Sequence, residues 1–167
     1  MKRKMFLFYI LLFAVIGFTG YMWYSNRPKP IPVVEKDSHI SQSLSYNEVN
    51  TFVYEQEDSV NLFFYSSDDV DSRYVIDNIL TPILQSANAT SFSNLIFVDL
   101  ATLPEDTDPK YTKNNWGFYN WPTFIVMKIT QDKGLETSDT LEWDPANPYN
   151  GDSVTTWLQA HGVKKSE

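Results

Sequence analysis

Residues 116–123 read W-G-F-Y-N-W-P-T, and residues 124–129 continue as F-I-V-M-K-I. The second run is mostly apolar and partly β-branched, which predicts a buried strand over residues 123–129. Proline has no backbone N–H to give a sheet, so within sheets it is confined to the first residue of a strand, an edge or a bulge. Pro122 therefore marks the entrance to this strand, and the bulky Trp121 directly precedes it.

The composition favours one globular domain with a small appendage. The chain has 167 residues, of which 43% are hydrophobic and 16% aromatic, enough to form a core. The formal net charge is −8, and because Lys2, Arg3 and Lys4 contribute +3, the remainder carries −11. Such an acidic body argues against nucleic acid as a partner, since nucleic-acid binding needs a basic face.

The sequence contains no cysteine. Disulfides, thiolate catalysis, cysteine-ligated zinc and iron–sulfur clusters are therefore excluded. There are two histidines, no glycine-rich phosphate loop occurs among the six glycines, and no metal-ligand spacing is present. The sequence thus predicts no cofactor, no metal site and no small-molecule substrate.

The N-terminus predicts a membrane anchor. Residues 1–4 hold the K-R-K cluster, and the nineteen residues 5–23 are uncharged. A helix of that length spans roughly 28 Å, close to the thickness of a hydrocarbon core. The alternative is a cleaved signal peptide, but the run is longer than usual and no A-x-A-like cleavage site closes it. Because basic flanks stay in the cytoplasm, we expect a single-pass protein of the cell membrane with a cytoplasmic N-terminus and an extracytoplasmic domain.

A proline-rich linker is expected over residues 24–44, followed by a domain over 45–163 and a tail over 164–167. Within the domain, helical and strand patterns alternate, which predicts an α/β architecture. The predicted elements are a helix at 46–56, a strand at 60–65, a helix at 71–86 kinked at Pro82, a strand at 95–100, a helix starting at 107–109, strands at 123–129 and 140–143, and a helix starting at Asp152 or Ser153.

This order of elements, together with the eight residues 116–123, resembles the thioredoxin-like superfamily. The pattern is aromatic-Gly-apolar-x-x-apolar-Pro-Thr, and Pro82 and the C-terminal amphipathic helix also match. The resemblance covers residues 46–162 and implies a central mixed β-sheet flanked by helices. It also implies that the Trp121–Pro122 bond is cis, and that Trp121 pairs with an extended peptide from a partner protein.

The chain departs from the family at the redox pair, which opens the helix after the first core strand. Alignment of that strand places Asp69 and Ser72 at the two cysteine positions. Neither side chain exchanges electrons, so we expect no thiol–disulfide activity and no enzymatic role.

The acidic residues near that helix have two interpretations. Carboxylates favour a helix N-terminus, with Asp71 as a possible N-cap. Alternatively, they join the loop at 104–108 in an acidic surface that receives a basic, partly apolar partner segment. Among the aromatic residues, Trp116, Phe118, Trp143 and Trp157 are expected in the core, and Tyr119 and Trp121 on the surface. The predicted partner-binding residues are Asp68, Asp69, Asp71, Ser72, Glu105, Asp106, Tyr119, Trp121 and Pro122.

Two functions are compatible with these observations. The first is a membrane-anchored, redox-inactive thioredoxin-like domain that binds protein partners in a cell-envelope machine, similar to the thioredoxin-like accessory proteins of Gram-positive bacteriocin export or conjugative type IV secretion. The second is an extracytoplasmic carboxylate- or metal-dependent enzyme that uses the acidic loops.

Overall fold

The computed structural model describes residues 43–108, 110–132 and 134–166. The predicted cytoplasmic N-terminus, the membrane anchor and all but the last two residues of the linker lie outside these ranges. Within them, no helix combines the length and the apolar character needed to cross a membrane.

A five-stranded mixed sheet forms the centre of the domain, with strands in the order β1-β4-β2-β5-β6. Strands β1 and β2 both run parallel to β4, whereas β5 runs antiparallel to β2 and to β6. A separate antiparallel pair joins β3 and β7. The bounds are β1 Ser43–Ser45, β2 Val60–Tyr65, β3 Ser91–Ser93, β4 Leu95–Asp99, β5 Thr123–Ile129, β6 Leu135–Glu142 and β7 Lys164–Ser166.

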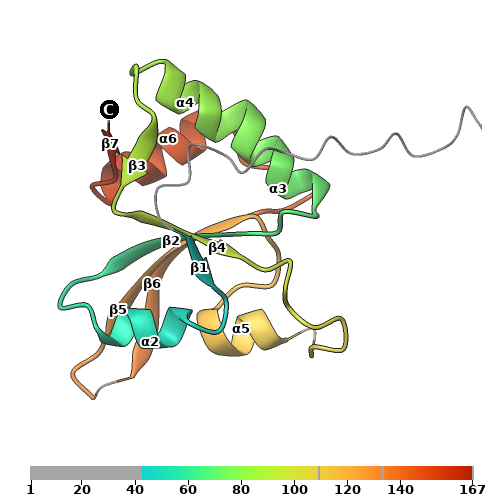
Figure 1. The fold of residues 1–167 in the computed structure, drawn as a ribbon, viewed down its shortest axis with the longest axis vertical. Helices are drawn as coiled ribbons and strands as arrows, with labels where there is room; N and C mark the ends of the chain where they lie inside the picture. The colour runs from blue at the N-terminus through green and yellow to red at the C-terminus, as the bar shows by residue number, and fades with distance from the viewer. Residues whose placement is uncertain (1–42, 109, 133, 167) are drawn as a thin grey trace, which may run out of the picture. The chain divides into compact units, whose positions relative to one another are not determined.

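Helices cover both faces of the large sheet (Figure 1). One face packs against the helices α3 Val70–Val75 and α4 Thr81–Gln85, the π-helical segment η1 Ile76–Leu80 between them, and α6 Gly151–Ala160. The other face packs against α2 Val49–Tyr54 and α5 Tyr111–Trp116. The result is the predicted thioredoxin-like α/β fold, a central mixed sheet between two layers of helices.

Strand β2 is buried along its whole length. Its side chains alternate between the two layers, so Phe63 stacks near Phe124 at 4.4 Å between ring centroids, while Phe64 lies 4.7 Å from the ring of Trp116 on the other face. A strand buried on both faces is mostly apolar without regular polar alternation, and V-N-L-F-F-Y has this pattern, with Asn61 as its one polar residue.

The predicted strands at 60–65 and 123–129 are confirmed with their bounds. The predicted helix at 71–86 is confirmed as one run of helix from Val70 to Gln85, interrupted by η1. There the N–H of Thr81 bonds to the carbonyl of Ile76, five residues earlier. Proline crowds the carbonyl four residues before it, and a π-turn is one way for a helix to accommodate this. The effect of Pro82 is therefore a change of hydrogen-bond register ahead of the proline.

Three short strands, β1, β3 and β7, were missing from the sequence prediction. Ser43–Ser45 pairs in parallel with Phe97–Asp99, so the domain begins inside the predicted linker. Lys164–Ser166 pairs with Ser91–Ser93, so the predicted tail is a strand. All three strands are three residues long and largely polar, and such segments carry no periodic signal.

Some element boundaries were also wrong. Helix α5 begins at Tyr111, after a turn in which Asp108 Oδ1 accepts the N–H of Lys110. Helix α6 begins at Gly151, because the extended Asn150 is its N-cap and accepts the N–H of Ser153. Strand β6 starts at Leu135, five residues earlier than predicted.

Truncation of Phe63 tests the role of β2 as the shared core. Phe63→Ala is expected to lower the free energy of unfolding by about 3–5 kcal/mol, because it empties a fully buried aromatic site. The measurement is urea unfolding of the full-length chain followed by circular dichroism. Tyr54→Ala, at a side chain 50% exposed, is the control and should change stability by less than about 0.5 kcal/mol. A loss below about 1 kcal/mol for Phe63→Ala would contradict the shared core.

Candidate partner-binding site

The sheet topology brings three loops to one edge. The parallel strands β2 and β4 end there, and β5, which is antiparallel to β2, begins there. The carboxylate of Asp99 joins two of these loops, since its Oδ1 accepts the N–H of Ser67 at 3.1 Å and of Ala101 at 2.9 Å. The loops at 66–69, 100–108 and 117–122 therefore form one surface, as the acidic-surface hypothesis required.

Side-chain acceptors fix the loop that precedes β5. Gly117, at φ +91°, ends α5 in the left-handed region that suits glycine. Glu142 Oε1 then accepts the N–H groups of both Tyr119 and Asn120, each at 2.8 Å. The hydroxyl of Thr123 donates to the carbonyl of Asn120. These contacts determine the conformation in which the loop reaches Trp121.

The Trp121–Pro122 peptide bond is cis, as predicted. Pro122 is buried, and its carbonyl accepts a hydrogen bond of 3.0 Å from the hydroxyl of Tyr149. Burial raises the pKa of the Tyr149 hydroxyl, so this donor stays protonated. Because Pro122 is buried, it stabilises the loop that carries Trp121 and is not itself a contact residue.

Trp121 and Tyr119 reach the surface, as predicted. Tyr119 is 53% exposed, and the ammonium of Lys113 lies 5.1 Å from the centre of its ring. Trp121 is half-buried. Among the described residues, no hydrogen-bond partner is found for either the backbone N–H or the backbone carbonyl of Trp121. A main-chain donor and acceptor are therefore available beside an exposed tyrosine.

The start of α3 corrects two assignments. Asp69, not Asp71, is the N-cap, and its Oδ2 accepts the N–H of Ser72 at 2.7 Å. Asp71 instead accepts a hydrogen bond of 3.0 Å from the indole N–H of Trp143. Ser72 is fully buried, and its Oγ accepts the N–H of Ser66. The side chain of Ser72 therefore stabilises the turn and cannot contact a partner, contrary to the prediction.

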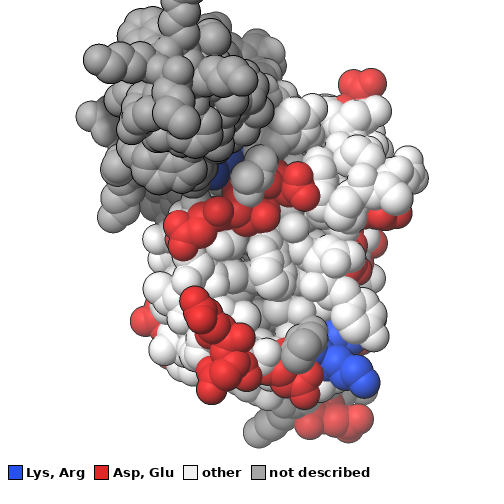
Figure 2. Space-filling model, turned by 90° about the vertical axis from the view of Figure 1, so that its right-hand side faces the viewer, with Lys and Arg blue, Asp and Glu red and all other residues white. Residues whose placement is uncertain are grey.

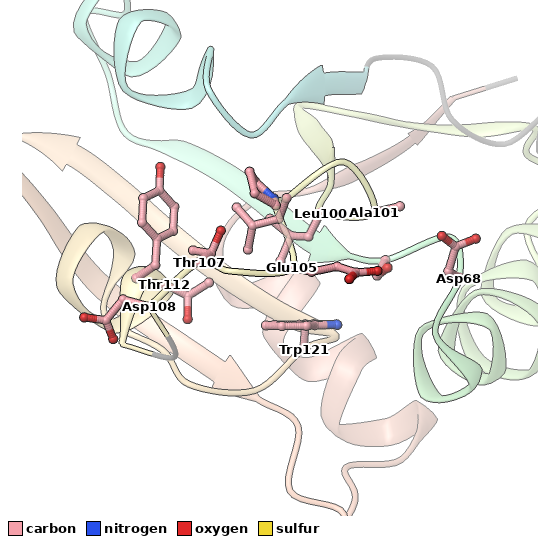
Figure 3. A pocket seen from close by; sticks show the side chains of 12 residues that line it. Asp68, Leu100, Ala101, Glu105, Thr107, Asp108, Thr112 and Trp121 are labelled. Carbon is pink, nitrogen blue, oxygen red and sulfur yellow. The ribbon is translucent and has the colours of Figure 1, made fainter.

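Two hollows flank Trp121. The first, of about 310 Å³, lies between the loops after β2 and β4 and includes Asp68, Glu105 and Trp121 (Figure 3). The second, of about 190 Å³, is lined by Asp69, Asp71, Tyr119, Asn120, Trp121, Trp143 and Pro145. Of the predicted site residues, only Ser72, Asp106 and Pro122 line neither hollow.

The second hollow includes residues that the sequence analysis did not assign to the site. Trp143 was predicted only as a core residue; it is buried, yet its edge also lines this hollow. Pro145 follows it in the loop after β6. The signal in the sequence was a proline-rich turn after a strand, but only the tertiary structure brings that turn beside α3.

Acidic side chains gather in separate groups on this face, with uncharged surface between them (Figure 2). We use the name acidic surface for Asp68, Asp69, Asp71, Glu105, Asp106 and Asp108. The ion pairs found within the described ranges, Lys128–Glu136 and His161–Asp139, lie elsewhere. In the same ranges no cluster of three or more His, Asp or Glu side chains is arranged to hold a metal ion.

The strand order, the cis-proline at the start of β5 and the two helical layers define a thioredoxin-like domain. No protein-family model and no curated protein sequence matches the chain. The fold is similar to that of solved thioredoxins, with low sequence identity. Thioredoxin from Plasmodium falciparum is 13% identical, with a TM-score of 0.44, over 77% of this chain and 94% of that one. Thioredoxin from Trichomonas vaginalis is 13% identical, with a TM-score of 0.41, over 75% and 97%. Mitochondrial thioredoxin 3 from Saccharomyces cerevisiae is 16% identical, with a TM-score of 0.41, over 71% and 93%.

Replacement of Glu142 tests how the loop before β5 is held. Glu142→Ala removes the acceptor shared by Tyr119 and Asn120, and their amide hydrogens should exchange with solvent about tenfold faster, since a hydrogen bond to a charged acceptor contributes about 1.5 kcal/mol or more. The measurement is hydrogen–deuterium exchange resolved by NMR. Glu142→Gln keeps a side-chain oxygen and should show a smaller effect. Unchanged exchange in Glu142→Ala would show that the loop is fixed by other contacts.

Proposed function

We propose that this chain is a membrane-anchored, extracytoplasmic thioredoxin-like domain without thiol chemistry or enzymatic activity, which binds protein partners in a cell-envelope assembly. Conjugative type IV secretion and bacteriocin export of Gram-positive bacteria are the machines we favour. The fold alone does not determine a function. The proposal therefore rests on the site, on the absence of cysteine from the sequence, and on the N-terminal apolar segment.

The backbone of Trp121 is the observation that carries the proposal. An extended peptide can add its main chain to unpaired donors and acceptors at a sheet, and pockets beside the new strand then select its side chains. Trp121 offers both backbone groups, and a hollow lies on each side of its indole. Tyr119, half exposed beside it, supplies an aromatic contact of the kind that contributes strongly to binding.

The charge of the surface supports a basic partner segment. The acidic surface carries carboxylates on both sides of Trp121, at Asp68 and Glu105 in one hollow and at Asp69 and Asp71 in the other. Complementary charge of this kind steers encounter and suppresses acidic competitors more than it adds affinity. Such a surface would also be repelled by anionic lipid headgroups, so we place it away from the membrane.

Site-specific photocrosslinking tests the binding surface. A photoreactive amino acid in place of Tyr119 is expected to give discrete protein adducts in cells, detected by blotting and identified by mass spectrometry. The same replacement of Tyr54 is the matched control, because the two tyrosines are 53% and 50% exposed but Tyr54 belongs to α2 and lines neither hollow beside Trp121. Equal adducts from both positions, or none from position 119, would contradict a partner at this site.

A topology reporter tests the membrane arrangement. A reporter enzyme that is active only in the cytoplasm, fused after Glu167, should be silent if the K-R-K cluster holds the N-terminus inside. The control is the same fusion to a chain that lacks residues 1–23, which should be active. An active full-length fusion would overturn the predicted orientation.

A further inference from the structure

The first hollow has a mixed lining (Figure 3). Its apolar part comes from Leu100, Leu103 and Pro104 and from the rings of Tyr111 and Trp121. At about 310 Å³ it is at the lower end of the range for ligand pockets, which is roughly 300–1,000 Å³. A hollow of this size suits one long side chain better than a cofactor.

The largely buried side chains of Ser66 and Thr112 line the same hollow. Ser66 is 8% exposed and Thr112 is 3% exposed. Within the described part of the chain, the hydroxyl of neither residue makes a hydrogen bond. A hydroxyl can both donate and accept a hydrogen bond, so two hydroxyls that make none with the described residues can bind a polar group of an occupant.

The charged groups of the hollow are all acidic. Asp68 and Glu105 are exposed at its edge, and neither has a hydrogen bond or an ion pair with any described residue. Asp108, the third carboxylate, is partly engaged by the N–H of Lys110. The hollow therefore offers acceptors for N–H donors, negative charge and aromatic rings in one place.

We propose that this hollow binds an arginine side chain of the partner segment. A guanidinium has five N–H donors in a planar fork, matches carboxylates and stacks on aromatic faces, whereas the compact ammonium of lysine matches fewer of these features. The apolar methylene chain of the arginine fits against the leucine and proline side chains that line the hollow. This inference rests on the proposed function, because the arginine belongs to the peptide that pairs with Trp121.

The sheet geometry explains how one peptide reaches both hollows. The first hollow is bordered by Tyr111 and Thr112 of the α5 layer, and the second by Asp71 and Trp143 of the opposite layer. Successive side chains of an extended strand point to opposite faces. A partner peptide that pairs with Trp121 as an extended strand can therefore place an arginine side chain in the first hollow. The next residue of that peptide then points toward the second hollow.

The test uses two acetylated, amidated pentapeptides, Ser-Val-Arg-Val-Ser and the same peptide with citrulline, which has the shape of arginine but no charge. They are titrated into the full-length chain in neutral detergent, and the indole signal of Trp121 is followed by NMR. That signal is assigned by its absence from the spectrum of Trp121→Phe. We expect the arginine peptide to bind at least about tenfold more tightly. The preference should disappear in Asp68→Asn/Glu105→Gln, and should fall about threefold in Thr112→Val, which keeps the side-chain shape.

The control is Glu57→Gln/Asp58→Asn, which makes the same change in net charge. These two residues lie near Asn61 at the start of β2, at the opposite end of that strand from the first hollow. It should keep the preference for arginine. Equal affinity for both peptides, or equal loss in both double variants, would overturn the arginine site and leave the peptide-binding function intact. If neither peptide shifts the signals of Trp121 or Tyr119, both the arginine site and the proposed function fail.

Discussion

The burial of β2 on both faces is the constraint on which the rest of the domain depends. Phe63 and Phe64 point into opposite layers, and each packs against aromatic rings from β4, β5 or the loop before β5. A strand of this kind must lie in the middle of the sheet and needs helices on both sides. Asn61, the polar residue within the strand, is satisfied by donating to the carbonyls of Asn94 and His161. The core therefore fixes which strand is central, and with it the direction of every neighbour.

The candidate partner-binding surface is a consequence of that arrangement. Because β4 is parallel to β2 and β5 is antiparallel to it, the ends of two strands and the start of a third meet at one edge. The side chains that hold the three loops there are polar: Asp99, Glu142 and the buried Ser72. Trp121 then lies at the junction, and its backbone N–H and carbonyl make no hydrogen bond with the described residues. A surface that displays main-chain donors and acceptors in this way can recognise an extended peptide without any reactive residue.

The start of α3 is held by side chains that carry no thiol. Asp69 caps the helix, and Ser72 accepts the N–H of Ser66 in the turn after β2. Carboxylates at a helix N-terminus are stabilising, so an aspartate suits this position. Asp69 and Ser72, at the two positions where the resemblance places cysteines, therefore have structural roles in this domain.

The sequence by itself determined the central strand, the strand after Pro122, the long helix and the surface position of Tyr119, because apolar periodicity, proline and aromatic placement are local signals. It also predicted that Asp68, Asp69, Asp71 and Glu105 lie around one site. That prediction depended on the resemblance of the order of elements to the thioredoxin-like superfamily. The tertiary structure alone decided the short strands at 43–45, 91–93 and 164–166 and the meeting of Ser66 and Thr112 at one hollow. These features depend on contacts between residues far apart in the chain, and such contacts leave no periodic trace in the sequence. The N-cap at Asp69 is a local contact with Ser72, but only the structure showed at which aspartate the helix begins.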